Sequence, residues 1–149
     1  MKDLFSTQDT TALLQRLEKL SPEAKPLFGK MRVEQMLAHC AMFIELASGK
    51  KVIPRMWLGR IFSGLAKSTF LSEKPYPRGI PTNPRFRVTD DRDFAAEKER
   101  LTRLIVEFAE AGPEGVTHNP HFFFGKISPG EWSQGMYKHL DHHLSQFGV

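Results

Sequence analysis

The sequence predicts an all-α protein, and three observations support this fold class. Apolar residues recur every three or four positions in five segments, which places them on one face of an α-helix. No segment shows the alternation of apolar and polar residues that a half-buried strand would need. The chain has 149 residues, 40% of them apolar and 26% charged, which suits a single domain over 1–149 with one core. Four main helices and a shorter fifth predict a four-helix bundle.

The first two helices have recognisable ends. The first is expected at about 9–20, with N-cap candidates among Asp9, Thr10 and Thr11 and a stop at Ser21-Pro22. The second is expected at about 32–48, where the apolar stripe is broad, and Gly49 is placed as its terminator.

The shorter fifth helix falls within 52–71, where Pro54 suits a first turn. Its helically spaced apolar residues are Trp57, Leu58, Ile61, Phe62 and Leu65, and its basic residues are Lys50, Lys51, Arg55, Arg60 and Lys67. Such a helix can lie on an anionic membrane, although its charges exclude a spanning helix. We expect it instead to pack across the bundle, with its basic side chains reaching out to solvent. Burial between two copies in a homodimer is the other alternative.

The second half of the chain contains the longest loop and two further helices. A proline-rich linker of about 20 residues follows the fifth helix, and its length predicts a crossover connection rather than a tight turn. The next helix is expected at about 93–111 and ends at Gly112-Pro113. The last helix begins with a capping box, in which Ser128 is the N-cap, Pro129 follows at N1 and Glu131 stands at N3.

Three histidines are candidate metal ligands. His139 and His143 are four residues apart, so they lie one turn apart on the same helix face, beside Gln146 and Trp132. His39, on the second helix, could supply a third nitrogen. Three neutral imidazoles leave a tetrahedral metal with one open position, as in catalytic zinc sites. The alternative is a set of partly buried histidines that hydrogen-bond to carbonyls or carboxylates. His118 and His121 are expected to be loop histidines.

Composition limits the other function classes. The net charge is +4, but basic and acidic residues are interspersed and no nucleic-acid-binding signature is present, so we expect no nucleic-acid partner. The single cysteine, Cys40, excludes an internal disulfide and is expected to be a small core residue. The first residues lack the apolar run of a signal peptide, which favours a cytoplasmic protein.

Two motifs resemble a known superfamily. The "LAHC" of the second helix and the terminal "HLDHHLSQ" resemble the DinB/YfiT-like superfamily, whose members are four-helix bundles with a metal site. The Phe-Gly-Lys-x-Ser-Pro-x-Glu-Trp motif at 124–132 and the "MYKHLDHHLSQFGV" ending resemble more closely a small bacterial branch known as a domain of unknown function. The resemblance implies that His39, His139 and His143 are the metal ligands and that Gln146 closes the terminal motif. Leu144-Ser145 stand where the superfamily often has Arg-Gly, so local helix packing is expected to differ.

The resemblance also implies a function. A Zn²⁺ or Ni²⁺ ion in a three-histidine site would support thiol transfer from a low-molecular-weight thiol, or hydrolysis of a small molecule. Gln146, Asp141 or Glu34 could orient the ligand rings. Three residues are expected to line an apolar substrate pocket: Trp132, Met136 and Phe43. No residue is assigned as a general base. The alternative is a non-catalytic bundle that binds a small ligand or a partner, with or without metal.

Overall fold

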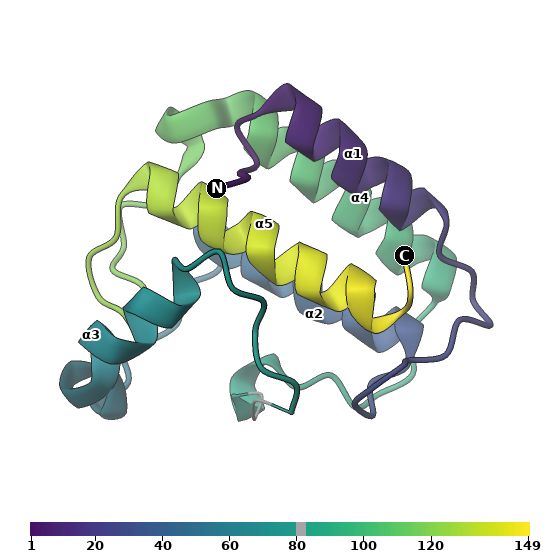
Figure 1. Cartoon of the computed structure of the whole chain (residues 1–149), viewed down its shortest axis with the longest axis horizontal. Coiled ribbons are helices and arrows are strands. Elements are labelled where there is room, and N and C mark those ends of the chain that lie inside the picture. The colour runs from purple at the N-terminus through teal and green to yellow at the C-terminus, as the bar shows by residue number, and fades with distance from the viewer. Residues whose placement is uncertain (80–82) are drawn as a thin grey trace.

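The computed structural model describes residues 1–79 and 83–149, and within these ranges the chain forms helices joined by loops, with no strand. This confirms the predicted all-α class. The helices are α1 (Thr7–Glu18), α2 (Val33–Ala47), α3 (Trp57–Phe70), α4 (Phe94–Ala111) and α5 (Pro129–Gln146), with short 3₁₀-helices η1 (Pro84–Phe86) and η2 (Gly112–Gly115) (Figure 1). Pro81 of the proline-rich linker lies outside the described residues.

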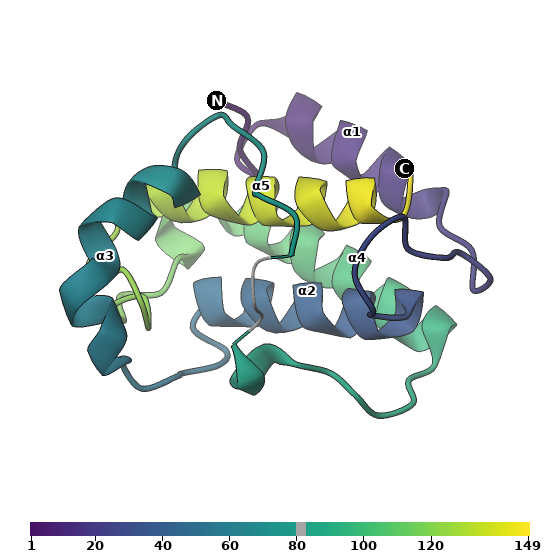
Figure 2. The same ribbon diagram turned by 60° about the horizontal axis from the view of Figure 1, so that its bottom comes forward.

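Helices α1, α2, α4 and α5 lie side by side and form what we call the helical core. Both α1 and α2 pack against α4 and against α5. In Figures 1 and 2, α1 and α5 run in one direction, while α2 and α4 run in the opposite direction. Because α2 and α4 are parallel, the segment between them must return the chain to the end at which α2 began. The segment between α2 and α4, which contains α3 and the proline-rich linker, is therefore a crossover. Helix α3 lies outside the helical core.

Helix α2 carries the largest share of the core because it is apolar on nearly every side. Met36, Leu37, Ala41 and Ile44 are each no more than 1% exposed. Removing such side chains from water stabilises the folded state by roughly 25 cal/mol per Å² of apolar surface. Helix α2 consequently lies buried between α4 and α5, where any polar residue must find a partner or bear a desolvation cost.

Most predicted helix ends are present, with one shift. The capping box of α5 is confirmed, since the Ser128 hydroxyl accepts from the Glu131 amide and the Glu131 carboxylate accepts from the Ser128 amide. Gly49 follows α2 with a φ of +76°, as expected of a terminator. The predicted N-cap of α1 is wrong. Ser6 caps this helix by accepting from the Asp9 amide, so α1 begins two residues earlier than expected.

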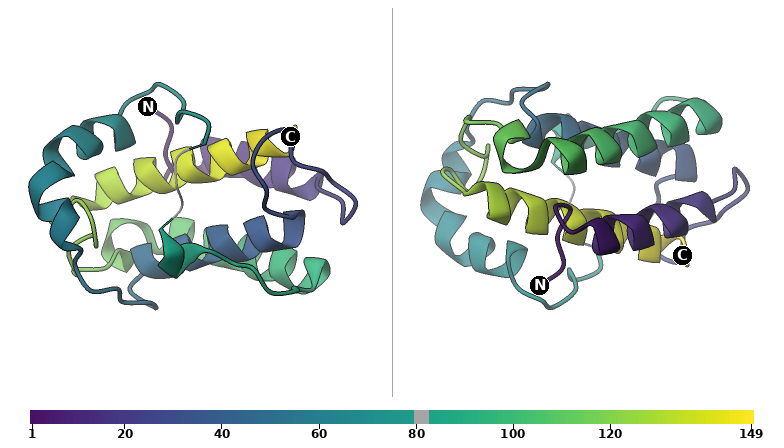
Figure 3. Two further views of the ribbon diagram at one scale, coloured as in Figure 1. Left: turned by 90° about the horizontal axis from the view of Figure 1, so that it is seen from below. Right: turned by 90° about the horizontal axis from the view of Figure 1, so that it is seen from above.

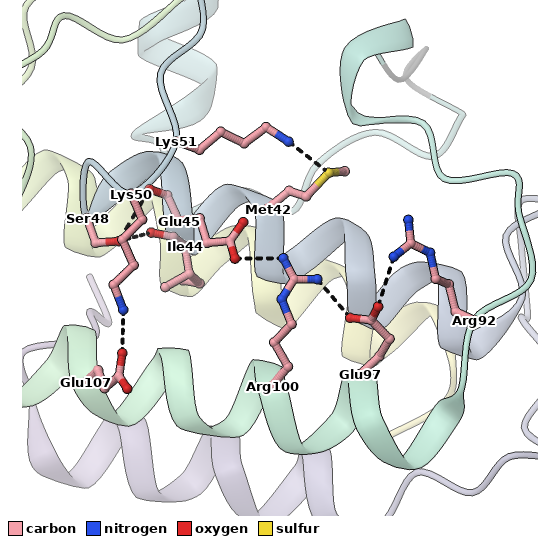
Figure 4. Close-up of polar contacts among 10 residues, drawn as sticks. All are labelled: Met42, Ile44, Glu45, Ser48, Lys50, Lys51, Arg92, Glu97, Arg100 and Glu107. Carbon is pink, nitrogen blue, oxygen red and sulfur yellow. Dashed lines mark hydrogen bonds and ion pairs between the residues drawn. The ribbon is translucent and has the colours of Figure 1, made fainter.

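Ion pairs join α2 to α4 along one side of the helical core (Figure 4). The Arg100 guanidinium of α4 lies 2.7 Å from the Glu45 carboxylate of α2 and 3.0 Å from that of Glu97. Arg92 contacts the same Glu97 carboxylate at 3.3 Å. Because Glu97 is buried, its charge needs these partners to offset the cost of desolvation. The network therefore fixes α4 against the helix that carries His39.

Helix α3 packs on the end of the helical core through the face that carries Gly59 and Phe70. It begins at Trp57, so the prediction that Pro54 lies in its first turn is wrong. A Cβ added to Gly59 would lie 2.3 Å from the Phe123 carbonyl oxygen, and a Cβ added to Gly135 of α5 would lie 1.9 Å from the Phe70 ring. These two glycines let the backbone of α3 approach the loop before α5, and let the Phe70 ring rest against α5.

The expectation that the apolar stripe of this helix packs across the bundle is wrong for the side chains that the structure describes. Trp57 is 69% exposed, Ile61 65%, Phe62 54% and Leu58 37%. The helix uses its opposite face for packing, because that face carries Gly59 and Phe70. The side chains of Arg60 and Leu65 lie outside the described part. No described helix is both long enough and apolar enough to cross a membrane.

The loop before α5 is organised around His121, which is only 2% exposed. Its Nδ1 atom accepts hydrogen bonds from the amides of Phe123 and Phe124, each at 3.1 Å. Its ring lies 4.4 Å from the Phe124 ring and 5.0 Å from the Trp132 ring. Burial lowers the pKa of His121 to about 3, so the imidazole is neutral and its Nδ1 lone pair is available. The prediction of a loop histidine is confirmed.

We predict that His121→Ala destabilises the fold and makes its stability less dependent on pH. The substitution leaves two amides unpaired, each costing about 1–3 kcal/mol if buried. The unfolded chain binds a proton near pH 6.5 but folded His121 does not, so the free energy of unfolding should fall as the pH drops from 6.5 toward 3. Urea unfolding across this range measures the effect.

The control for this experiment is His118→Ala, because His118 belongs to the same loop and is exposed. This variant should keep both the stability and the pH profile of the wild type. Parallel pH profiles for His121→Ala and the wild type would show that buried His121 does not resist protonation.

Candidate metal centre

The packing of α2 against α5 brings the three predicted histidines together. One nitrogen from each of His39, His139 and His143 can be chosen so that all three lie within 4.8 Å of one another. His39 is 3% exposed and His143 7%, whereas His139 is half-buried. The i, i+4 spacing in α5 aims two rings at α2, and His39 faces them from the second helix. This buried cluster could hold a metal ion.

The separations suit a tetrahedral ion. Imidazole nitrogens bind Zn²⁺ at about 2.0–2.1 Å, which places two such ligands about 3.3 Å apart. The Nε2 atoms of His39 and His139 lie 3.2 Å apart. The third ring lies edge-on to both, with centroids 4.8 Å from His39 and 4.6 Å from His139. One nitrogen of His143 lies within 4.8 Å of a nitrogen of each of the other two rings.

Two of the rings are held in the orientation that a metal ligand needs. The Nδ1 of His39 lies 2.8 Å from the Phe86 carbonyl oxygen, and the Nδ1 of His143 lies 2.9 Å from Oε1 of Gln146. Both oxygens can only accept, so each Nδ1 carries the proton and each Nε2 keeps its lone pair. The Gln146 amide is itself oriented, because its Nε2 donates to the Phe28 carbonyl at 2.7 Å. Such outer hydrogen bonds are typical of metal-binding histidines.

The third ring carries an unpaired polar atom. The Nδ1 of His139 is buried and has no hydrogen-bond partner among the described residues. Beside it the Phe43 ring lies 4.2 Å from the His139 ring, centroid to centroid, and offers no partner of its own. Buried unpaired atoms are rare in folded proteins and are often found where function requires them.

All three imidazoles are held neutral, which is the form that binds metal. Burial is the main cause and lowers the pKa of each ring. It lowers the pKa of His143 to about 3, with a further contribution from His39. The pKa of His139 falls well below its usual range through burial and through the nearby His143 and His39. Near pH 7 the three imidazoles are therefore uncharged, so none has to lose a proton before its lone pair can bind a metal ion.

Aromatic rings cover the cluster on two sides. Phe43 lies between His139 and the Phe86 ring, whose centroid is 4.1 Å away, so the expected pocket residue Phe43 adjoins the cluster. On the other side, His142 lies 5.1 Å from His143, and its ring is contacted by Phe28 and Tyr76. Burial raises the pKa of Tyr76, which therefore remains a neutral phenol. The cluster thus lies in a mostly apolar setting.

Several other predicted site residues have different surroundings. Trp132 is buried against the ring of His121, and Met136 is fully buried in the core. The two carboxylates expected to orient the histidines have other partners, since Asp141 pairs with Arg16 and Glu34 pairs with Arg32. Arg16 also donates to Ser145 at 3.1 Å, which gives a packing role to a position where the sequence departs from the superfamily pattern. Cys40 is 1% exposed, which confirms it as a core residue.

Sequence reasoning missed the two carbonyl groups that orient the cluster. Phe86 and Phe28 act through backbone oxygens, which every residue type possesses, so no residue pattern identifies them. Phe86 lies in η1 within the crossover, 47 positions from His39 in the sequence. Its fully buried ring anchors the crossover against α2, and this anchoring sets the position of the carbonyl.

Comparison with known proteins gives one match. A family model described as "Protein of unknown function (DUF1569)" matches residues 2–148. No curated protein matches the chain, and no solved structure matches it. The matched region covers nearly the whole sequence, as the resemblance of both histidine motifs to a domain of unknown function had suggested. The chain therefore belongs to the DUF1569 family.

Proposed function

We propose that His39, His139 and His143 bind one divalent transition-metal ion, Zn²⁺ or Ni²⁺, and that the protein is a metal-dependent enzyme acting on a small molecule. The observation that carries this proposal is the pair of hydrogen bonds that two Nδ1 atoms donate, from His39 to the Phe86 carbonyl and from His143 to Oε1 of Gln146. They direct two Nε2 lone pairs toward one region between α2 and α5, where the third histidine also lies.

The chemistry follows from the ligand count. A metal held by three imidazoles keeps one open position, where it lowers the pKa of a bound thiol or water and supplies a nucleophile near neutral pH. We propose thiol transfer from a low-molecular-weight thiol to an electrophilic small molecule, or hydrolysis, as the reaction. The half-buried side chains of Phe43 and His139 mark the side from which a substrate would approach. Phe43 would contact its apolar part and help to exclude water.

We further propose that the helical core is a four-helix bundle of the DinB/YfiT-like kind and that residues 1–149 form one domain. Two features support this placement. One candidate ligand comes from α2 and two come from the last helix, four residues apart, as in that superfamily. The connection between α2 and α4 is a crossover, which leaves those two helices parallel.

We predict that tag-free, chelator-treated protein takes up about one equivalent of Zn²⁺ or Ni²⁺ per chain. His39→Ala, His139→Ala and His143→Ala should each abolish tight binding, because two imidazoles cannot enclose the ion. Calorimetric titration measures the stoichiometry and affinity. Thermal unfolding gives a second readout, since a ligand at 100 times its Kd stabilises the fold by about 2.7 kcal/mol. His118→Ala, at an exposed histidine, is the control and should bind like the wild type.

We predict that Gln146→Leu keeps the stoichiometry but weakens metal affinity about 10- to 100-fold, because the His143 ring loses the acceptor that fixes its orientation. The matched control is Asp141→Asn. Asp141 lies on the same helix as Gln146, and its substitution removes the ion pair with Arg16 of α1 but touches none of the three histidines in the described contacts. Competition with a chromophoric chelator measures both affinities. Equal affinity in Gln146→Leu and Asp141→Asn would argue against an orienting role for Gln146.

We predict that the metal-loaded protein turns over in a screen of thiol transfer and hydrolysis. Cysteine or glutathione with chlorodinitrobenzene tests the first reaction, and nitrophenyl esters test the second. Activity should require added metal and should disappear in His139→Ala while surviving in His118→Ala. Tight metal binding without turnover in either assay would instead favour the non-catalytic bundle.

A further inference from the structure

The apolar residues of α3 form an exposed ridge, which we call the α3 ridge: Trp57, Leu58, Ile61 and Phe62. Helix α3 stands at one end of the helical core, clear of the other helices along much of its length (Figure 3). At about 100° per residue, Trp57 and Ile61 lie opposite Gly59 and Phe70, through which the helix packs. Trp57 and Ile61 therefore point away from the protein, while Leu58 and Phe62 lie along one side of the helix and are 37% and 54% exposed.

The ridge is too apolar to be ordinary surface. Trp57 and Ile61 are more than three-fifths exposed, and Val52, just before the helix, is 66% exposed. Single apolar residues are common on protein surfaces, but four exposed ones within six positions of one helix, two of them aromatic, indicate a site of interaction. The core gains nothing from this arrangement, since α3 is already held by Phe70 and by the Met56 amide, which donates to the Phe122 carbonyl at 2.8 Å.

The charged residues of the segment that carries the ridge have one sign. Between residues 46 and 72 the sequence has no acidic residue and five basic ones: Lys50, Lys51, Arg55, Arg60 and Lys67. Lys50 and Lys67 pair with Glu107 and Glu131 of neighbouring helices, and Arg55 is exposed. An apolar ridge with aromatic residues, flanked by basic residues, has the composition of a helix that lies in the plane of an anionic membrane surface.

A second copy of the chain fits this surface less well. A two-fold interface through α3 would bring two basic segments face to face, and like charges across an interface oppose association. The four ridge side chains also supply only a few hundred Å², whereas a stable interface buries about 800 Å² per partner. A lipid surface needs no matching partner and takes up a helix of this length, about 21 Å, lying flat.

We propose that α3 is a peripheral membrane-docking helix. The α3 ridge enters the interface of an anionic bilayer, with Leu58 and Ile61 deepest and Trp57 and Phe62 on either side of them at the boundary between headgroups and acyl chains, while the exposed Arg55 contacts lipid phosphates. The helical core stays outside the bilayer, because no described helix can span it. This inference is independent of the metal centre and holds whether or not the histidines bind an ion.

Vesicle flotation of the tag-free chain tests the proposal. The wild type should float with vesicles of phosphatidylcholine and phosphatidylglycerol, and much less with phosphatidylcholine alone. Tryptophan emission should shift to shorter wavelength on binding, because Trp57 is exposed while Trp132 is already buried. The double variant Trp57→Ser/Ile61→Ser should bind at least about tenfold more weakly, since it loses two insertable side chains. High salt should also reduce binding.

The control variant is Leu27→Ser, because Leu27 is 70% exposed but lies in the connector between α1 and α2. It should float like the wild type. Circular dichroism verifies that all variants remain helical, as expected for changes at exposed positions. Absence of flotation, or equal flotation of the double variant, would overturn the proposal. Equal binding to neutral vesicles would overturn the choice of an anionic surface, and a dimer in light scattering that only the double variant disrupts would assign the ridge to a second copy.

Discussion

Between α2 and α5 the protein places three imidazoles within an otherwise apolar interface. The neighbouring structure supplies the hydrogen bonds that offset the free-energy cost of burying them. A buried polar ring destabilises the fold unless its nitrogens find partners. His39 and His143 each have Nδ1 satisfied from outside the cluster, and one nitrogen of each of the three rings lies within 4.8 Å of the others. A metal ion shared by the three would satisfy these inner nitrogens at once. The geometry of the cluster and its neutrality are accounted for together in this way.

The crossover links the fold to this site. A short hairpin from α2 to the next core helix would not pass over the histidines. The long connection instead inserts the Phe86 ring beside Phe43 and so places a carbonyl oxygen on His39. At the C-terminal end of α5, the connector before α2 supplies the Phe28 carbonyl that orients Gln146. Two loops thus determine which nitrogen His39 and His143 present to the cluster.

The parts of the structure that were predictable share a physical basis. The capping box at Ser128 and Glu131, the i, i+4 pair in α5 and the apolar stripe of α2 are local patterns whose geometry follows from the helix itself. The Phe86 and Phe28 carbonyls, the alternative partner of Asp141 and the outward ridge of α3 depend on contacts between distant segments. Helical spacing identified the apolar side of α3 correctly, but only the close approach at Gly59 and Gly135 decides that the opposite side packs.

X-ray absorption at the metal edge of the Zn²⁺-loaded protein tests the central claim most directly, because it reports the atoms around the ion. The account predicts three imidazole nitrogens at about 2.0–2.1 Å and one further light atom, the exchangeable fourth ligand. A sulfur neighbour, a shell of oxygen atoms alone or fewer than three imidazoles would contradict it. Any of these results would show that the three histidines pack together without jointly binding the ion.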